Sequence, residues 1–84
     1  MKVIKAEAVA GFKSSYAKIY EVELWFEGDD LSKRGKSDQF GYDELLHLAG
    51  GQKGWNFKRV TAFLNTEAGL KWINDILERR LKRA

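Results

Sequence analysis

The last twenty residues, 65–84, constrain the fold most, because their apolar side chains recur at helical spacing. Asn65 or Thr66 offers a side chain suited to cap the first turn. An apolar stripe of this width must be buried against another element, so the sequence predicts a C-terminal amphipathic helix that covers one face of a sheet. The stripe and the opposite, charged face consist respectively of Leu70, Ile73, Ile76, Leu77 and Leu81, and of Lys71, Asp75, Glu78 and Lys82.

Two segments near the N-terminus, residues 2–10 and 16–27, alternate in the period-two pattern that is typical of strands. The connecting residues 11–15 suit a hairpin loop, so we expect the two strands to pair antiparallel. The residues expected to share a face are Ile4, Ala6, Ala8 and Ala10 in the first strand, and Tyr20, Val22, Leu24 and Phe26 in the second.

The middle of the chain predicts a loop, a short strand and a short helix. Residues 29–36 are the most polar segment and indicate a solvent-exposed loop, and residues 37–40 can add a strand. Residues 42–49 place apolar side chains at helical spacing, and Gly50 follows where a left-handed residue would end the helix.

Residues 55–64 fit two patterns. A helical stripe and a period-two alternation both match, but the β-branched and aromatic content and the new helix cap at Asn65 or Thr66 favour a strand. We therefore expect the order ββ(β)αβα in a single α+β domain over residues 1–84. A mostly antiparallel sheet of three or four strands would be packed by the short helix and the long C-terminal amphipathic helix.

Composition limits the class of protein. The 84 residues suffice for one domain. The absence of cysteine excludes disulfides, a thiolate metal site and a cysteine nucleophile. Charges at Lys2, Lys5 and Glu7 interrupt the N-terminal apolar residues, which is unlike a signal peptide, and no apolar run approaches the roughly 18 residues of a membrane span. We expect a soluble cytoplasmic protein that does not engage a membrane.

The formal charge of +3 is unevenly distributed. Residues 1–30 carry a net charge of −2, whereas residues 31–84 carry +5. Such polarity can steer a nucleic acid towards the basic side of a protein. The leading hypothesis is a small non-catalytic module that binds nucleic acid mainly through phosphate. Its candidate residues are Lys33, Arg34, Lys36, Lys53, Lys58, Arg59, Arg79, Arg80, Lys82 and Arg83.

These cations also have a structural interpretation. Those near the C-terminus complement the dipole of the last helix, and those of residues 33–36 suit a plain solvated turn. Aromatic residues beside Arg59, namely Trp55, Phe57 and Phe63, suit base stacking if exposed, but a domain this small needs most of its large side chains in the core.

The alternative hypothesis is a protein-interaction or inhibitor module. It would act through a protein contact formed by Trp25 with Glu21, Glu23 and Glu27, or through a free sheet edge. The small, cysteine-free, aromatic-rich composition is also typical of accessory proteins of phages and mobile elements. A homodimer joined through sheet edges or through the last helix is a further possibility.

Catalytic patterns are scarce. His47 is the single histidine and has no serine or cysteine partner at a recognisable spacing. The acidic residues suit loop tips and the first turn of a helix without any metal. We expect no enzyme activity, no metal and no cofactor.

Overall fold

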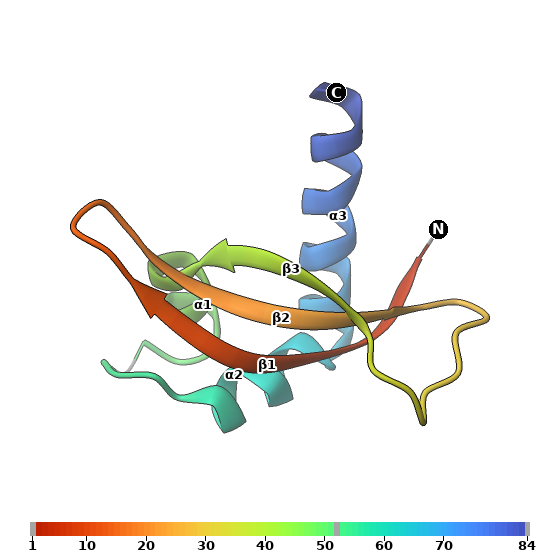
Figure 1. The fold of residues 1–84 in the computed structure, drawn as a ribbon, viewed down its shortest axis with the longest axis horizontal. Coiled ribbons are helices and arrows are strands. Elements are labelled where there is room, and N and C mark those ends of the chain that lie inside the picture. The colour runs from red at the N-terminus through yellow and green to blue at the C-terminus, as the bar shows by residue number, and fades with distance from the viewer. Residues whose placement is uncertain (1, 52, 84) are drawn as a thin grey trace.

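The computed structural model describes residues 2–51 and 53–83, with the side chain of Arg83 outside the described part. Three strands are followed by three helices (Figure 1). This arrangement confirms the α+β class. The elements are β1 (Val3–Lys13), β2 (Lys18–Phe26), β3 (Lys36–Gly41), α1 (Tyr42–Leu48), α2 (Phe57–Leu64) and α3 (Glu67–Arg83).

The strands form one antiparallel sheet in the order β1-β2-β3. The register of β1 against β2 shifts twice, between Val3 and Lys5 and between Ala8 and Ala10, and each shift inserts one extra residue into β1. Val3 is therefore buried with Ala6 and Ala8, whereas Ile4 is exposed. The expectation that Ile4 and Ala10 share the buried face with Ala6 was wrong, because the bulges change the alternation at both ends of β1.

The segment expected to be a fourth strand is helix α2. A side-chain cap begins the helix, because the side chain of Asn56 accepts a hydrogen bond from the backbone N–H of Arg59 at 3.2 Å. Val60 and Leu64, one helical turn apart, are both fully buried. The helical stripe in this segment therefore prevails over its period-two alternation.

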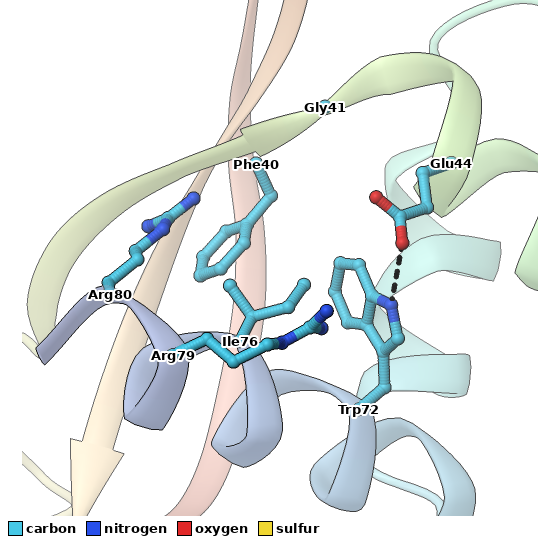
Figure 2. A pocket seen from close by; sticks show the side chains of 7 residues that line it. All are labelled: Phe40, Gly41, Glu44, Trp72, Ile76, Arg79 and Arg80. Carbon is cyan, nitrogen blue, oxygen red and sulfur yellow. Dashed lines mark hydrogen bonds between the residues drawn. The ribbon is translucent and has the colours of Figure 1, made fainter. Parts of the chain in front are cut away.

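Helix α3 crosses the covered face of the sheet and continues beyond it, so that its C-terminal end projects from the molecule (Figure 1). Burial falls along its apolar stripe, since Ile73 is fully buried, Leu77 is half-buried and Leu81 is 76% exposed. Near the projecting end, Arg80 donates to the backbone oxygen of Gln39 in β3 at 2.8 Å and lies over the ring of Phe40 (Figure 2). The apolar stripe is therefore covered best at Ile73, and Arg80 keeps the later part of α3 in contact with β3.

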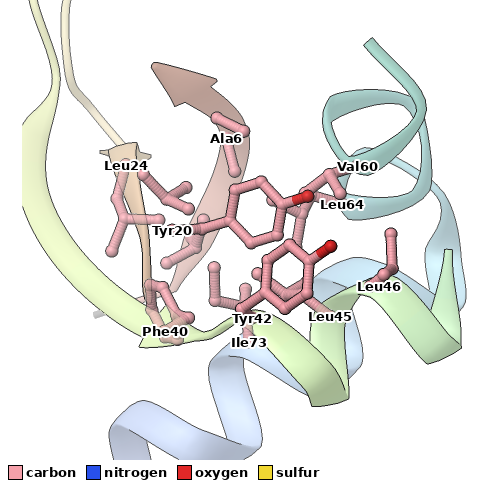
Figure 3. Close-up of a cluster of buried hydrophobic side chains, with 13 residues drawn as sticks. Ala6, Tyr20, Leu24, Phe40, Tyr42, Leu45, Leu46, Val60, Leu64 and Ile73 are labelled. Carbon is pink, nitrogen blue, oxygen red and sulfur yellow. The ribbon is translucent and has the colours of Figure 1, made fainter. Parts of the chain in front are cut away.

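The core lies between the sheet and the three helices, all of which pack on one face (Figure 3). Tyr20, Val22 and Leu24 of β2 point into it, as the alternation of that strand predicts. The junction of α2 and α3 is tight, because a Cβ at Gly69 would collide with the backbone of Phe63 and Leu64. The side chains with the least exposure are Tyr20, Phe40, Leu45, Leu64, Ile73, Val3, Val22 and Val60.

Side chains occupy the outer edges of the sheet. Along the free edge of β1, the backbone of Val3, Ala6 and Ala8 makes five hydrogen bonds with side chains of α2, α3 and the residue that joins them. On the β3 edge, the backbone oxygen of Gln39 accepts a hydrogen bond from Arg80. The backbone N–H of Gln39 donates to the Asp38 carboxylate at 2.8 Å. A strand added at either place would have to displace these contacts.

Candidate nucleic-acid interface

Two segments distant in sequence meet at the turn between β1 and β2. Residues 8–20 form most of this hairpin, and residues 45–51 and 53–66, which include α2, lie beside it (Figure 1). The ring of Trp55 lies against the backbone of Gly11, and the N–H of Asn56 donates to the hydroxyl of Tyr20 at 3.4 Å. We call the region formed by residues 8–20 and 45–66 the hairpin end.

The charge of the hairpin end is entirely positive. Its two segments contain Lys13, Lys18, Lys53, Lys58 and Arg59 and no aspartate or glutamate. All five cations are exposed. Carboxylates stand directly beside both segments in the sequence, at Glu7, Glu21, Glu44 and Glu67. A cluster of cations without interspersed carboxylates raises the local potential felt by a polyanion.

A cluster of four aromatic rings holds the two segments together. Tyr20 and Tyr42 are stacked with centroids 5.5 Å apart, and Trp55 meets both edge-on at 5.2 and 4.8 Å. Phe57 stacks on Trp55 at 6.3 Å. The hydroxyl of Tyr42 accepts from the N–H of Gly54 at 2.9 Å, which fixes the loop that presents Trp55. The loop before α2 is therefore anchored to the sheet.

Burial raises the pKa of the Tyr20 hydroxyl above its ordinary value of 10.0. The hydrogen bond from the Asn56 backbone acts in the opposite direction, and the neighbouring Tyr42 adds to the rise. Tyr20 is therefore a neutral structural group at physiological pH, and its hydroxyl orders the chain just ahead of α2.

Exposed aromatic side chains gather in the same region. Among the described residues, the aromatic side chains with large exposed surfaces are Phe12, Tyr16 and Trp55, and Tyr16 at the hairpin tip is 96% exposed. Ser14 shapes the tip, since its hydroxyl accepts from the N–H groups of Tyr16 and Ala17 at 3.2 and 3.0 Å. Exposed rings beside cations are what stacking on nucleobases requires.

The sequence placed Lys53, Lys58, Arg59 and the ring of Trp55 among the candidates, whereas Lys13, Lys18 and the rings of Phe12 and Tyr16 were missed. A signal was present, because both segments lack carboxylates. The net charge of residues 1–30 concealed this signal. The carboxylates in the second half of β2 and in the loop after that strand outnumber the two lysines of the hairpin.

The β2–β3 loop lies at the other end of β2 from the hairpin tip (Figure 1). At about 3.3 Å per residue, the strand separates the two by roughly 26 Å. Here Arg34 contacts the Glu23 carboxylate at 3.4 Å, and Lys36 lies over the ring of Phe26 at 5.7 Å. The backbone oxygen of Lys33 accepts a hydrogen bond from the indole N–H of Trp25. Glu27, Asp29 and Asp30 share this region, so its cations are interspersed with carboxylates.

The cations of α3 form a third group. Arg80 pairs with the Asp38 carboxylate at 3.1 Å, and Lys82 pairs with Glu78 at 3.4 Å. Arg79 borders a cleft of about 240 Å³ in which the Trp72 N–H donates to Glu44 at 3.1 Å (Figure 2). Arg80 thus holds α3 on β3, and Arg79 and Glu44 both line the cleft. The predicted contact of Arg83 lies outside the described side chains.

The proposed protein contact around Trp25 is covered. Trp25 is 5% exposed, its indole N–H donates to the backbone oxygen of Lys33 at 2.8 Å, and Lys5 lies over its ring. Glu23 is buried beside it and accepts from the N–H of Gly35 at 3.1 Å. Glu21 is half-buried and Glu27 is exposed. Trp25 and Glu23 therefore hold the β2–β3 loop over the outer face of the sheet.

Within the described part of the chain, no group of three or more histidine or acidic side chains lies close enough to hold a metal ion. His47 lies exposed on α1. Hydrogen bonds from the side chain and backbone of Ser32 lower the pKa of Asp30 from 3.8, and they order the turn at that place. The Asp30 carboxylate therefore has a structural partner in Ser32.

Comparison with protein-family models, with curated proteins and with solved structures gave no match to this chain. None of the helices in the described residues is long and apolar enough to cross a membrane.

Proposed function

We propose that this chain is a small, non-catalytic module that binds single-stranded nucleic acid at the hairpin end. The observation behind the proposal is that the two segments of the hairpin end carry five exposed cations and no carboxylate, together with the exposed rings of Phe12 and Tyr16 and the partly exposed ring of Trp55. Cations neutralise phosphates without reading sequence, and exposed rings stack on bases of any kind. The binding would be strongly salt-dependent and weakly specific.

The cations elsewhere support this choice of surface. Arg34, Arg80 and Lys82 are already paired with carboxylates of the chain, whereas no ion pair occurs among the described contacts of the five cations in the hairpin end. The protein-contact alternative is less well supported, because Trp25 lies under the β2–β3 loop and the outer edges of the sheet carry side-chain hydrogen bonds.

Fluorescence anisotropy tests the proposal with labelled single-stranded DNA and RNA of about 12 nucleotides, and with the matching duplexes, at about 50 and 200 mM salt. The diagnostic variant combines Lys13→Gln, Lys18→Gln and Lys53→Gln. The matched control, Lys33→Gln with Arg34→Gln and Lys36→Gln, removes the same charge from the β2–β3 loop.

We expect the hairpin variant to reduce the salt slope of log K by about two, since each lost phosphate contact on a single strand contributes about 0.7. The loop control should reduce it much less. Absence of binding at low salt, or equal losses in the two variants, would contradict the proposal.

A further inference from the structure

An open groove runs along α3 beside the start of β1. It has a volume of about 590 Å³ and is lined by Leu70, Asn74, Leu77 and Leu81, with Lys2 at its border. Leu70 and Leu77 are half-buried, and Leu81 is exposed. An apolar row of this kind on a projecting helix is typical of an interaction surface.

The spacing of the row is that of a helix–helix seam. Leu70, Asn74, Leu77 and Leu81 are separated by four, three and four residues, which is the alternation that lets two helices pack with knobs in holes. Asn74 is committed to β1, because its side chain accepts from the N–H of Val3 at 2.8 Å and donates to the Val3 oxygen at 3.1 Å. Leu81 is exposed, and Leu70 and Leu77, which pack against the core on one side, keep part of their surface uncovered.

The charges beside the seam are self-complementary. Lys71 and Glu78 are seven residues apart and therefore lie on the same flank of α3. Both side chains are exposed, and their contacts within the helix, to Asp75 and Lys82, are pairs at the surface. When two copies of α3 run antiparallel, the same flank of each helix meets in reverse order. Lys71 of each copy then faces Glu78 of the other, which gives two lysine–glutamate pairs.

We propose that α3 binds a second copy of this chain in an antiparallel pair around a two-fold axis. In this register Leu70 packs against the partner's Leu81, Leu77 against the partner's Asn74, and Lys71 faces the partner's Glu78. The apolar layers and the charge pairs require the same alignment of the two helices, which identifies a second copy as the occupant. A two-fold interface uses one patch twice, and this patch complements itself. The inference is independent of nucleic-acid binding.

Sedimentation velocity on nuclease-treated protein, from about 1 µM to 1 mM, tests the pairing. The wild-type chain should pass from monomer to dimer within this range. Leu81→Glu should abolish the dimer while leaving the fold intact, because the side chain is mostly exposed. A monomer at every concentration, or a dimer that Leu81→Glu does not affect, would overturn the proposal.

Exchange of charge tests the orientation. Lys71→Glu and Glu78→Lys should each weaken self-association by about tenfold, since two attractive pairs become repulsive in each dimer. An equimolar mixture of the two variants should recover wild-type dimerisation, because glutamate again faces lysine at both positions. Lys33→Glu in the β2–β3 loop is the control for net charge. Failure of the mixture to recover would overturn the antiparallel register.

Discussion

The side-chain amide of Asn65 pairs with the backbone of Ala6 as a neighbouring strand would. Its oxygen accepts from the Ala6 N–H at 3.0 Å, and its nitrogen donates to the Ala6 oxygen at 2.7 Å. The side-chain amide of Asn74 makes the same two hydrogen bonds with the backbone of Val3. The Thr61 hydroxyl accepts a hydrogen bond from the N–H of Ala8. The helices thus satisfy an edge strand that would otherwise be open to pairing with other chains.

Replacing this amide tests its role. Asn65→Ala leaves the N–H and oxygen of Ala6 without protein partners, and we expect it to lower the free energy of unfolding by about 1–3 kcal/mol and to promote aggregation. Urea denaturation and light scattering measure the two effects. Gln39→Ala removes an exposed amide and should change stability by less than about 0.5 kcal/mol. An Asn65→Ala protein as stable and soluble as the Gln39→Ala control would contradict this role.

A repulsive pair lies on the outer face of the sheet. Glu7 of β1 is directly opposite Glu23 of β2, and the Glu23 side chain is held in place by Gly35 and Arg34. Like charges at opposed positions destabilise an antiparallel pair, and opposite charges stabilise it. Glu7→Lys should therefore raise the free energy of unfolding by about 0.2–1 kcal/mol at low salt.

The gain should shrink at about 1 M salt, where exposed charges are screened. Glu27→Lys makes the same change of charge at an exposed residue outside β2 and is the matched control. Equal stability changes in the two variants would show that net charge, and not the opposition of Glu7 and Glu23, is responsible.

The elements with a single consistent pattern were predictable from sequence. The alternation of β2 and the stripe of α3 each specify one buried face, and the structure buries Tyr20, Val22, Leu24 and Ile73 accordingly. Residues 57–64 were not predictable in the same way, because Val60 and Leu64 fit the buried face of either a helix or a strand. The tertiary contact with β1 and the cap at Asn56 make the segment helical.

Other features depend on contacts between distant segments. The burial of Trp25 follows from a bond to the Lys33 backbone across the β2–β3 loop, and no local pattern specifies that bond. The bulges that bury Val3 and expose Ile4 arise from the register of β1 on β2. The candidate site also depends on such contacts, since the packing of Trp55 on Gly11 and the hydrogen bond between Asn56 and Tyr20 bring its lysines on β1 and β2 to those near α2.

That packing leads to a prediction for Gly11. A Cβ at this position would overlap the ring of Trp55, so Gly11→Ala must displace the indole from the aromatic cluster. We expect a loss of about 1–3 kcal/mol in stability from overpacking, with increased tryptophan exposure to quencher. Gly41→Ala is the control, because its φ is −63° and no atom lies within 4 Å of the added carbon. Unchanged quenching in Gly11→Ala would contradict the placement of Trp55.

The buried hydroxyl of Tyr20 predicts a change of stability in alkali. Burial raises the pKa of Tyr20 in the folded state above 10.0, so the unfolded chain loses this proton first as the pH rises. The contribution of Tyr20 to stability is therefore complete below about pH 9 and declines above pH 10, because ionisation then favours the unfolded state. In Tyr20→Phe this decline should be absent, although the variant loses the hydrogen bond from Asn56.

Urea unfolding of both proteins between about pH 7 and 11 measures the difference, with Tyr16→Phe as the control at an exposed ring. Parallel pH profiles for wild type and Tyr20→Phe would show that the hydroxyl ionises equally readily in the folded and unfolded chains.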